Sequence, residues 1–390
     1  MKKIFFMAVS AVLLAAGCQK TEIQNEVIPQ IGFKTQMGKL TKNPDAEKSG
    51  PYDNLVEQDF RVWGYFVKAD DLNYKPGDNY FGPNPADGID VATDLGADNL
   101  PVCNTGDNVY YWPGKNKELD LYAVSLWNNQ TGTDVNTYNK VAIDPTNKVL
   151  TVTNFVVNND ADDDLMVAPL IRQDQDDSEF VQPNFKHALT KVLVNFKSSI
   201  ETGVYVVSAK ITGVKNSGTL TVTNTLPTPE PESGVKVAEA LFAWAPNETT
   251  TDYTAVCKKA ATGNISAAKP GQNASTYSAV AIDNSGYLTY GSWLLIPHEN
   301  TIQNEIVTKR GIEGIKLVVD YIVDGIYVSQ TFELAPANAT VTEWGINKQT
   351  SYNVLISPEY ITFEPEVQDW TDSKTETEPR GDYEAPAQNN

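Results

Sequence analysis

The stretch from Ile315 to Val328 reads IKLVVDYIVDGIYV and is the strongest indication of the fold class. β-branched and aromatic residues fill both sides of the pair Asp324-Gly325. Such residues favour strands, and an Asp-Gly pair adopts the backbone conformation of a two-residue hairpin turn. The stretch therefore predicts two antiparallel strands joined at Asp324-Gly325.

Short runs of the same kind recur along the chain. The clearest are Phe60–Val67, Leu119–Val124, Val149–Thr153, Lys191–Phe196 and Tyr205–Val207. Turn-forming residues separate them, as at Asn73–Asp78 and Lys215–Gly218. Residues 185–196 also show helical spacing, but the alternation of Val192, Val194 and Phe196 favours a strand.

The pattern predicts an all-β protein of sandwich type with Greek-key-type strands and few short helices. Its best helical candidate is Val235–Trp244, which has an apolar face at helical spacing. The 390 residues leave room for two domains in tandem. The polar stretch Asp174–Pro183 predicts their boundary, which gives an N-terminal domain at 31–183 and a C-terminal domain at 184–370.

The N-terminus has the pattern of a bacterial lipoprotein precursor. Two lysines precede an apolar run from Ile4 to Ala16, which is too short to span a bilayer as a mature helix. The run ends in Leu14-Ala15-Ala16-Gly17-Cys18, a lipobox pattern. This predicts a signal peptide at 1–17 and acyl chains such as palmitate on Cys18, which would anchor the protein in the outer membrane. An uncleaved signal with an accidental Cys18 is the alternative.

The segments next to the predicted domains are polar. Residues 18–30 are predicted to be a flexible tether, and residues 371–390 a disordered tail, because they hold few apolar side chains. The tail contains Arg380-Gly381-Asp382, an integrin-type tripeptide that also arises by chance. The formal net charge of −20 excludes nucleic acid as an expected partner.

The sequence contains no motif that predicts catalysis or a cofactor. Gly-x-Ser-x-Gly elbows, phosphate loops and dinucleotide fingerprints are absent from it. The only histidines, His187 and His298, lie far apart without metal-ligand spacing, which favours structural roles. Cys103 and Cys257 could form a disulfide, although two free thiols are expected.

One acidic run resembles a calcium loop. Asp160, Asp162 and Asp164 alternate, but Leu165 and Ile171 occupy the places where an EF-hand has glycine and glutamate. We therefore expect a solvated acidic loop, with weak calcium binding as the alternative, and predict no metal site.

Several segments in order along the chain are similar to the fimbrillin family of Bacteroidales, the lipoprotein-derived subunits of type V pili. They are Ile31–Thr35, Phe60–Tyr65, Tyr110–Pro113, Leu119–Ala123, Asp164–Ala168, Phe185–Val192, Leu294–Pro297, Trp344–Lys348, Tyr352–Ile356 and Ile361–Trp370. The resemblance implies two β-sandwich-like domains and a location at the cell surface in a fimbrium. It also implies polymers with identical or different pilus subunits.

In this family, the resemblance implies, a protease removes the N-terminal strand and a C-terminal strand of the next subunit fills the exposed groove. The candidate donor stretch runs from Tyr352 to Val367. Its candidate donor residues are Tyr352, Val354, Ile356, Ile361 and Phe363. An ordinary internal strand is the alternative, which the sequence alone favours.

The cleavage site departs from the family pattern. Related stalk subunits are cut after arginine, but the first arginine here is Arg61, within a predicted core strand. The basic candidates before it are Lys34, Lys39, Lys42 and Lys48. Either a lysine-tolerant protease acts, or the N-terminal strand is kept and the protein stays anchored.

A second class of function is a surface glycan-binding lipoprotein, since exposed tryptophans can stack on sugar rings. The chain has seven tryptophans, most of them in apolar strands, where core packing is the expected role. Trp127, beside Asn128-Asn129-Gln130, is the best candidate for contact with a host or microbial surface ligand.

Overall fold

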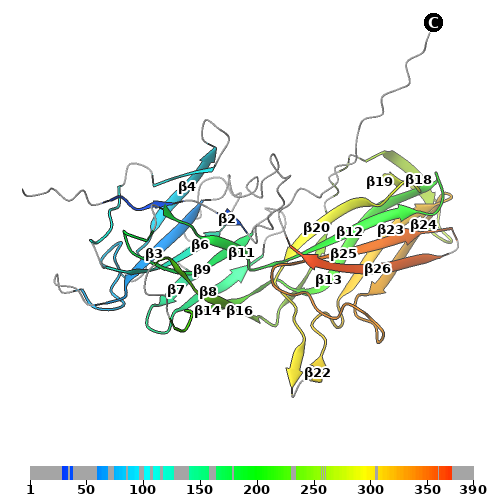
Figure 1. The fold of residues 1–390 in the computed structure, drawn as a ribbon. Coiled ribbons are helices and arrows are strands. Elements are labelled where there is room, and N and C mark those ends of the chain that lie inside the picture. The colour runs from blue at the N-terminus through cyan, green and yellow to red at the C-terminus, as the bar shows by residue number, and fades with distance from the viewer. Residues whose placement is uncertain are drawn as a thin grey trace, which may run out of the picture.

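The regular secondary structure in the described part of the protein is β-strand, arranged as two groups of sheets that lie side by side (Figure 1). The structure, a computed structural model, describes residues 29–33, 36–37, 59–68, 74–84, 87–95, 101–105, 109–114, 117–126, 140–157, 164–177, 180–229, 234–255, 257, 259, 261–303, 306–358 and 360–370. These ranges contain no α-helix, and therefore none that is long and apolar enough to cross a membrane. The all-β prediction is confirmed.

The first lobe contains two packed sheets. The larger has the order β2-β11-β9-β6-β3-β4-β5, with β15 also paired to β9. Its strands are β2 (Gln36–Met37), β3 (Phe60–Phe66), β4 (Ile89–Leu95), β5 (Pro101–Asn104), β6 (Leu119–Leu126), β9 (Leu165–Gln173), β11 (Asn184–His187) and β15 (Lys236–Val237). The smaller, ordered β16-β14-β8-β7, is formed by β7 (Val141–Asp144), β8 (Val149–Val156), β14 (Ser217–Thr225) and β16 (Glu239–Pro246).

Successive side chains of a strand point to opposite faces of its sheet, and both faces of the larger sheet are buried. On one face, Trp63 and Tyr65 of β3 pack in a core with Leu150 of β8 and Val222 of β14. On the other face, Phe60, Val62 and Phe66 of β3 pack in a separate core with Ile31 and Phe33. The N-terminal segment thus covers a face that the smaller sheet does not reach.

The second lobe is formed by two further sheets around one core. One has the order β20-β12-β25-β26, formed by β12 (Thr190–Ser198), β20 (Leu288–Leu295), β25 (Lys348–Ile356) and β26 (Ile361–Asp369). The other contains β13 (Val204–Lys215), β17 (Thr250–Thr254), β18 (Gly263–Ala268), β19 (Ala274–Ile282), β23 (Lys316–Val323) and β24 (Ile326–Glu333). The shared core includes Val194, Trp293, Trp344 and Tyr352.

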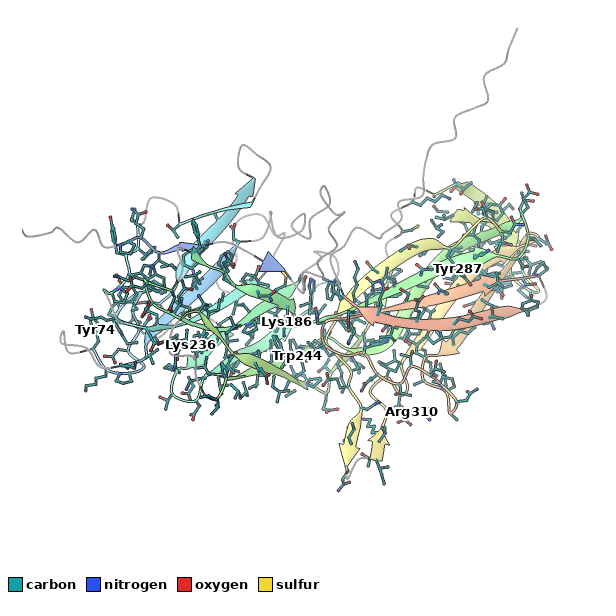
Figure 2. The ribbon with its side chains drawn as sticks, in the orientation of Figure 1. Tyr74, Lys186, Lys236, Trp244, Tyr287 and Arg310 are labelled. Carbon is teal, nitrogen blue, oxygen red and sulfur yellow. The ribbon has the colours of Figure 1, made fainter. Side chains whose placement is uncertain are left out.

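Two small sheets complete the described fold. β1 (Gly32–Phe33) pairs with β10 (Phe180–Val181) beside the first lobe. The hairpin of β21 (Thr301–Gln303) and β22 (Ile306–Lys309) projects from the second lobe (Figure 1). Arg310, at the base of this hairpin in Figure 2, donates hydrogen bonds to the carbonyls of Ala335, Pro336 and Ala337.

Two of the predicted elements are confirmed by the pairing. β23 and β24 form the antiparallel hairpin at Asp324-Gly325, whose φ angles of 50° and 76° are those of a tight turn. Residues 192, 194 and 196 lie in β12, as their alternation predicts.

The predicted helix at Val235–Trp244 is wrong, because this stretch forms β15 and β16. In β16, Phe242 pairs with Val222 and Trp244 pairs with Leu220. Ala240, Phe242 and Trp244 pack against the core, whereas Leu241, which lies between Ala240 and Phe242, is 71% exposed. The apolar residues therefore follow a period of two, and pairing with β14 outweighs their helical spacing.

The sheets of the first lobe cross the predicted domain boundary after residue 183. β11, β14, β15 and β16 all follow this position, yet β11 and β15 pair with β9 and β14 pairs with β8. The two-domain division therefore stays a proposal, and the first unit has to include strands from both sides of residue 183.

His298 provides a test of the packing near β13. Its Nδ1 lies 2.7 Å from the carbonyl oxygen of Ile296, and its Nε2 accepts a hydrogen bond from Lys215 N at 3.1 Å. These contacts fit the neutral ring, with the Nδ1 proton donated to the carbonyl. Burial lowers the pKa of His298 to about 4, although the bond to Ile296 opposes the shift.

We expect His298 to make the fold less stable in mild acid. The unfolded chain protonates this ring near pH 6.5 and the folded chain only near pH 4, so stability falls as the pH decreases through that window. Between pH 7 and 4.5 the loss from this group is about 2–3 kcal/mol. Urea unfolding should show a smaller loss for His298→Gln over this range. An equal loss in both proteins would contradict this role for His298.

Candidate functional site

The N-terminal segment is held between two parts of the first lobe that are distant in sequence. On one side, Ile31 N donates to Tyr110 O at 2.8 Å, and Trp112 N donates to Pro29 O at 3.0 Å. On the other side, β1 runs parallel to β10, with Phe33 opposite Val181. Backbone hydrogen bonds therefore fix residues 29–33 along both edges.

The side chains of this segment fill an apolar groove on the larger sheet. Ile31 and Phe33 are 6% and 5% exposed and pack with Phe60, Trp112 and Phe185. The ring of Phe33 meets Phe60 edge to face at 6.1 Å, and Phe60 meets Phe185 at 5.3 Å. Burial of Ile31 and Phe33 contributes roughly 1.5–3 kcal/mol each, so loss of the segment would expose an apolar groove.

β2 continues this arrangement at the edge of the larger sheet. It runs parallel to β11, with Gln36 opposite Asn184 and Met37 opposite Phe185. Without β2, β11 would become the edge strand and present unpaired backbone groups. The buried Oδ1 of Asn184 has no hydrogen-bond partner among the described residues. We call the site that residues 29–33 and β2 occupy the N-terminal seat. When it is vacated, it would offer an apolar groove, an open strand edge and a buried hydrogen-bond acceptor.

The residues predicted for lipidation and processing lie outside the described ranges. They are Cys18, Lys34, Lys39, Lys42 and Lys48. By sequence position, a cut after Lys34 would separate β1 from β2, and a cut after any of the other lysines would remove both strands. Arg61 lies in β3 at the centre of the larger sheet and pairs with Asp90 at 2.6 Å, so a cut there would divide the sheet.

The predicted donor stretch corresponds to two different strands. Tyr352, Val354 and Ile356 lie in β25 and are at most 1% exposed. β25 is an internal strand, parallel to β12 and antiparallel to β26. Ile361 and Phe363 lie in β26, the outermost strand of the same sheet. Of the two, only β26 can leave without separating two neighbours.

β26 has one apolar side and one polar side. Phe363 stacks on Tyr352 at 5.0 Å and on Phe332 at 5.6 Å. Glu364 and Glu366 on its other side are exposed, and Pro365 lies between them. Acidic residues and proline on an edge strand disfavour uncontrolled pairing with other chains. The strand therefore has the alternation that a groove requires, together with features that protect a free edge.

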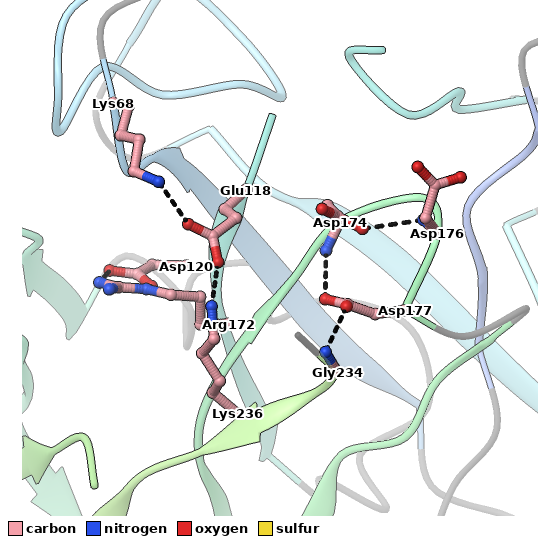
Figure 3. A network of polar contacts seen from close by, with 9 residues as sticks. All are labelled: Lys68, Glu118, Asp120, Arg172, Asp174, Asp176, Asp177, Gly234 and Lys236. Carbon is pink, nitrogen blue, oxygen red and sulfur yellow. Dashed lines mark hydrogen bonds and ion pairs between the residues drawn. The ribbon is translucent and has the colours of Figure 1, made fainter. Parts of the chain in front are cut away.

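A polar network fixes the turn that leads into β10 (Figure 3). Asp177 accepts hydrogen bonds from Asp174 N at 3.0 Å and from Gly234 N at 2.8 Å. Asp174 in turn accepts one from Asp176 N at 2.8 Å. This turn connects β9 to β10 and is tied to the segment before β15, which holds β10 in place for β1.

Ion pairs lie next to this turn (Figure 3). Glu118 pairs with Lys236 and with Lys68; burial raises the pKa of Glu118, the two lysines lower it, and the net shift is downward. Arg172 donates two hydrogen bonds to the Asp120 carboxylate, at 2.7 and 3.0 Å, and both side chains are buried. The pair bridges β6 and β9 inside the larger sheet.

Arg172→Ala should destabilise the protein by about 3–5 kcal/mol, because Asp120 would remain buried without its cation. The matched control is Lys210→Ala. Nζ of Lys210 lies 3.4 Å from Oδ2 of Asp252, and the Asp252 side chain is half exposed. We expect that control to change stability by at most about 1 kcal/mol. Denaturant unfolding measures both, and similar effects of the two substitutions would show that the buried pair has no special role.

The other predicted site residues have different outcomes. His187 and His298 are buried in separate core regions, and no group of three or more potential metal ligands occurs among the described residues. Asp160 and Asp162 lie outside these residues, as do Trp127 and Arg380–Asp382. The expectation of a solvated loop is wrong at Asp164, which is 7% exposed and lies 2.6 Å from His187. Cys257 is a free thiol, as expected.

Comparison with known proteins gives one family match. Residues 84–370 match the family model described as fimbrillin-like. No curated protein sequence matches the chain.

Several solved structures are similar to this chain at low sequence identity. A fimbrial protein from Bacteroides vulgatus is 16% identical, covers 88% of this chain and 99% of its own length, and has a TM-score of 0.49. A candidate cell adhesion protein from Bacteroides uniformis is 14% identical over 88% and 99% of the two chains, with a TM-score of 0.45. The tip fimbrial protein Mfa3 from Porphyromonas gingivalis, with a C-terminal truncation, is 10% identical over 80% and 94%, with a TM-score of 0.35.

Proposed function

Because the chain belongs to the fimbrillin-like family, we propose that it is a structural and adhesive subunit of cell-surface fimbriae that assembles with other subunits by strand donation. The observation that supports this most directly is the seat of the N-terminal segment. Residues 29–33 and β2 occupy an apolar groove and a strand edge, and both are held by contacts that a different strand could reproduce.

In this proposal, a cut at one of the candidate lysines releases the N-terminal strands. The exposed groove then takes a strand from a neighbouring subunit, whose backbone pairs with β11 and whose alternate side chains replace Ile31 and Phe33. If no cut occurs, the seat stays occupied and the protein remains an anchored monomer. The processing step would thus control entry into the polymer.

β26 is the better candidate for the donated strand. It has a single neighbour, β25, and its apolar side chains Ile361 and Phe363 alternate with polar ones. Release of β25 would instead break its pairing with β12 and expose Tyr352, Val354 and Ile356. We therefore assign donation to β26 and an internal role to β25.

We further propose that the chain reaches the outer membrane as a lipoprotein attached through Cys18. Cys18→Ala should abolish incorporation of a fatty-acid analogue and detach the protein from membranes, because the acyl chains supply the membrane affinity. The matched control is Cys257→Ala, which should be labelled as strongly as the native protein. Continued labelling of Cys18→Ala would exclude this attachment.

The state of the native protein separates a pilus subunit from a glycan binder. Mildly heated cell-surface extracts should contain ladders of high-mass polymer that collapse on full denaturation. A glycan-binding lipoprotein would instead be monomeric and retarded in polysaccharide gels. Of the six described tryptophans, five are at most 7% exposed, and Trp244 is partly buried and donates to Ala188 O at 2.7 Å. These rings take part in packing contacts within the protein, which favours a pilus subunit over a glycan binder.

A further inference from the structure

The C-terminal end of β26 contacts the first lobe as well as its own. Trp370 follows β26 directly, and its ring stacks on that of His187 with 3.5 Å between centroids and 5° between planes. Trp370 is 7% exposed and shares a core cluster with Ala188 and Leu189. Its backbone N–H donates to the carbonyl oxygen of Asn347, the residue before β25, at 3.0 Å.

The histidine in this stack is itself held in place. Nδ1 of His187 lies 2.6 Å from Oδ2 of Asp164, the residue before β9, and both side chains are buried. This contact fixes the ring plane on which Trp370 lies. The other oxygen of Asp164 is buried without a hydrogen-bond partner among the described residues, so the closed arrangement also contains an unfavourable element.

The same short strand contacts both ends of the chain. His187 is the last residue of β11, and two residues earlier Phe185 lies opposite Met37 of β2 and packs against Phe60. Departure of β1 and β2 would remove one neighbour of β11 and part of the packing around Phe185. The support for His187 would therefore weaken when the N-terminal seat is vacated.

The position of Trp370 also determines how β26 can peel away. At its other end β26 is joined to β25 through a short connection, in which Ser357 N donates to Tyr360 O at 2.8 Å. Peeling therefore has to begin at the Trp370 end. Besides the stack, that end is held by its backbone pairing with β25, by the bond from Trp370 N to Asn347 O and by an exposed ion pair between Lys348 and Asp369, which stabilises weakly.

From these contacts we propose that the Trp370–His187 stack is an autoinhibitory latch, which holds β26 in its own subunit until the N-terminal strands leave β11. This inference rests on the proposed function, because it assigns regulation to the strand that would be donated. It gives assembly an order: a subunit whose seat is occupied keeps its donor strand, and a processed subunit releases it.

Hydrogen–deuterium exchange of the β26 amides in the purified protein tests the latch. Trp370→Ala should make these amides exchange at least about tenfold faster while those of β23 stay unchanged, because only the edge strand is freed. Trp370→Phe keeps a flat ring, and Lys348→Ala removes only the exposed ion pair, so both should exchange like the native protein. Unchanged β26 exchange in Trp370→Ala, or equal acceleration throughout the lobe, would overturn the latch.

The same exchange measurement tests whether the N-terminal strands and the Trp370–His187 stack are coupled. Removal of residues 18–48, or Phe33→Ala in the intact chain where the removal prevents folding, should accelerate β26 exchange. In a protein that already carries Trp370→Ala, neither change should accelerate β26 exchange further. Equal acceleration in both backgrounds would show that the seat and the latch are independent. A freed β26 without polymer would leave the latch standing and would count against strand donation instead.

Discussion

A chain that ends at Gln349 should fail to fold its second lobe, whereas a chain that ends at Trp370 should be as stable as the full protein. The shorter chain lacks most of β25, which pairs with β12 from Lys191–Gln349 to Ser198–Ile356. It also lacks the buried side chains of Tyr352, Val354 and Ile356, whose burial stabilises by roughly 1.5–3 kcal/mol each. Their sum approaches the whole stability of a typical domain, about 5–15 kcal/mol.

A third chain, ending at Pro358, separates folding from assembly. It keeps β25 and lacks β26, so we expect a folded monomer of reduced stability that forms no polymer after N-terminal processing. Urea unfolding followed by circular dichroism measures folding, and size-exclusion chromatography measures assembly. Polymer formed by the Pro358 chain would exclude β26 as the donor, and a stable second lobe in the Gln349 chain would exclude β25 from the core.

Removal of residues 18–48 should convert the monomer into a self-associating protein. The deletion takes away Ile31 and Phe33, whose burial together contributes roughly 3–6 kcal/mol, and leaves the edge of β11 unpaired. A strand from a second copy can restore both contacts, which makes association favourable.

The matched control for this deletion is removal of residues 18–28 alone. That change keeps residues 29–33 and β2, so the protein should stay monomeric in sedimentation measurements. The longer deletion should give a ladder of oligomers, and should give none when combined with the chain end at Pro358. A monomer as stable as the undeleted protein would show that residues 29–37 do not cover an assembly site.

Local patterns in the sequence predicted the elements that depend on neighbouring residues. The Asp324-Gly325 hairpin and the alternation in β12 are of this kind, because turn chemistry and side-chain period act over a few positions. The stretch Val235–Trp244 failed because its helical spacing and its strand alternation compete. Pairing of β16 with β14 decides between them, and local sequence does not contain that pairing.

Contacts between distant segments could not be predicted. The sequence indicated a strand near Ile31, but not that β10, far along the chain, would be its partner. Nor did any motif connect His187 to Trp370, since a stack between two single residues has no sequence signature. The contacts that cross the polar stretch 174–183 are also non-local: Asp177 accepts a hydrogen bond from Gly234 N, and β14, which follows this stretch, returns to pair with β8.

The most direct test of strand donation is a disulfide between two chains of the polymer. Both chains lack residues 18–48 and carry Cys103→Ser and Cys257→Ser. One has Asn184→Cys in β11, and the other has a cysteine at Thr362, Glu364 or Glu366, which share one side of β26. The account predicts a covalent dimer on oxidation of the mixture for at least one of these positions, and none for Thr254→Cys on the edge strand β17. A polymer that forms without any link between β11 and β26, or that links equally well through Thr254→Cys, would contradict it.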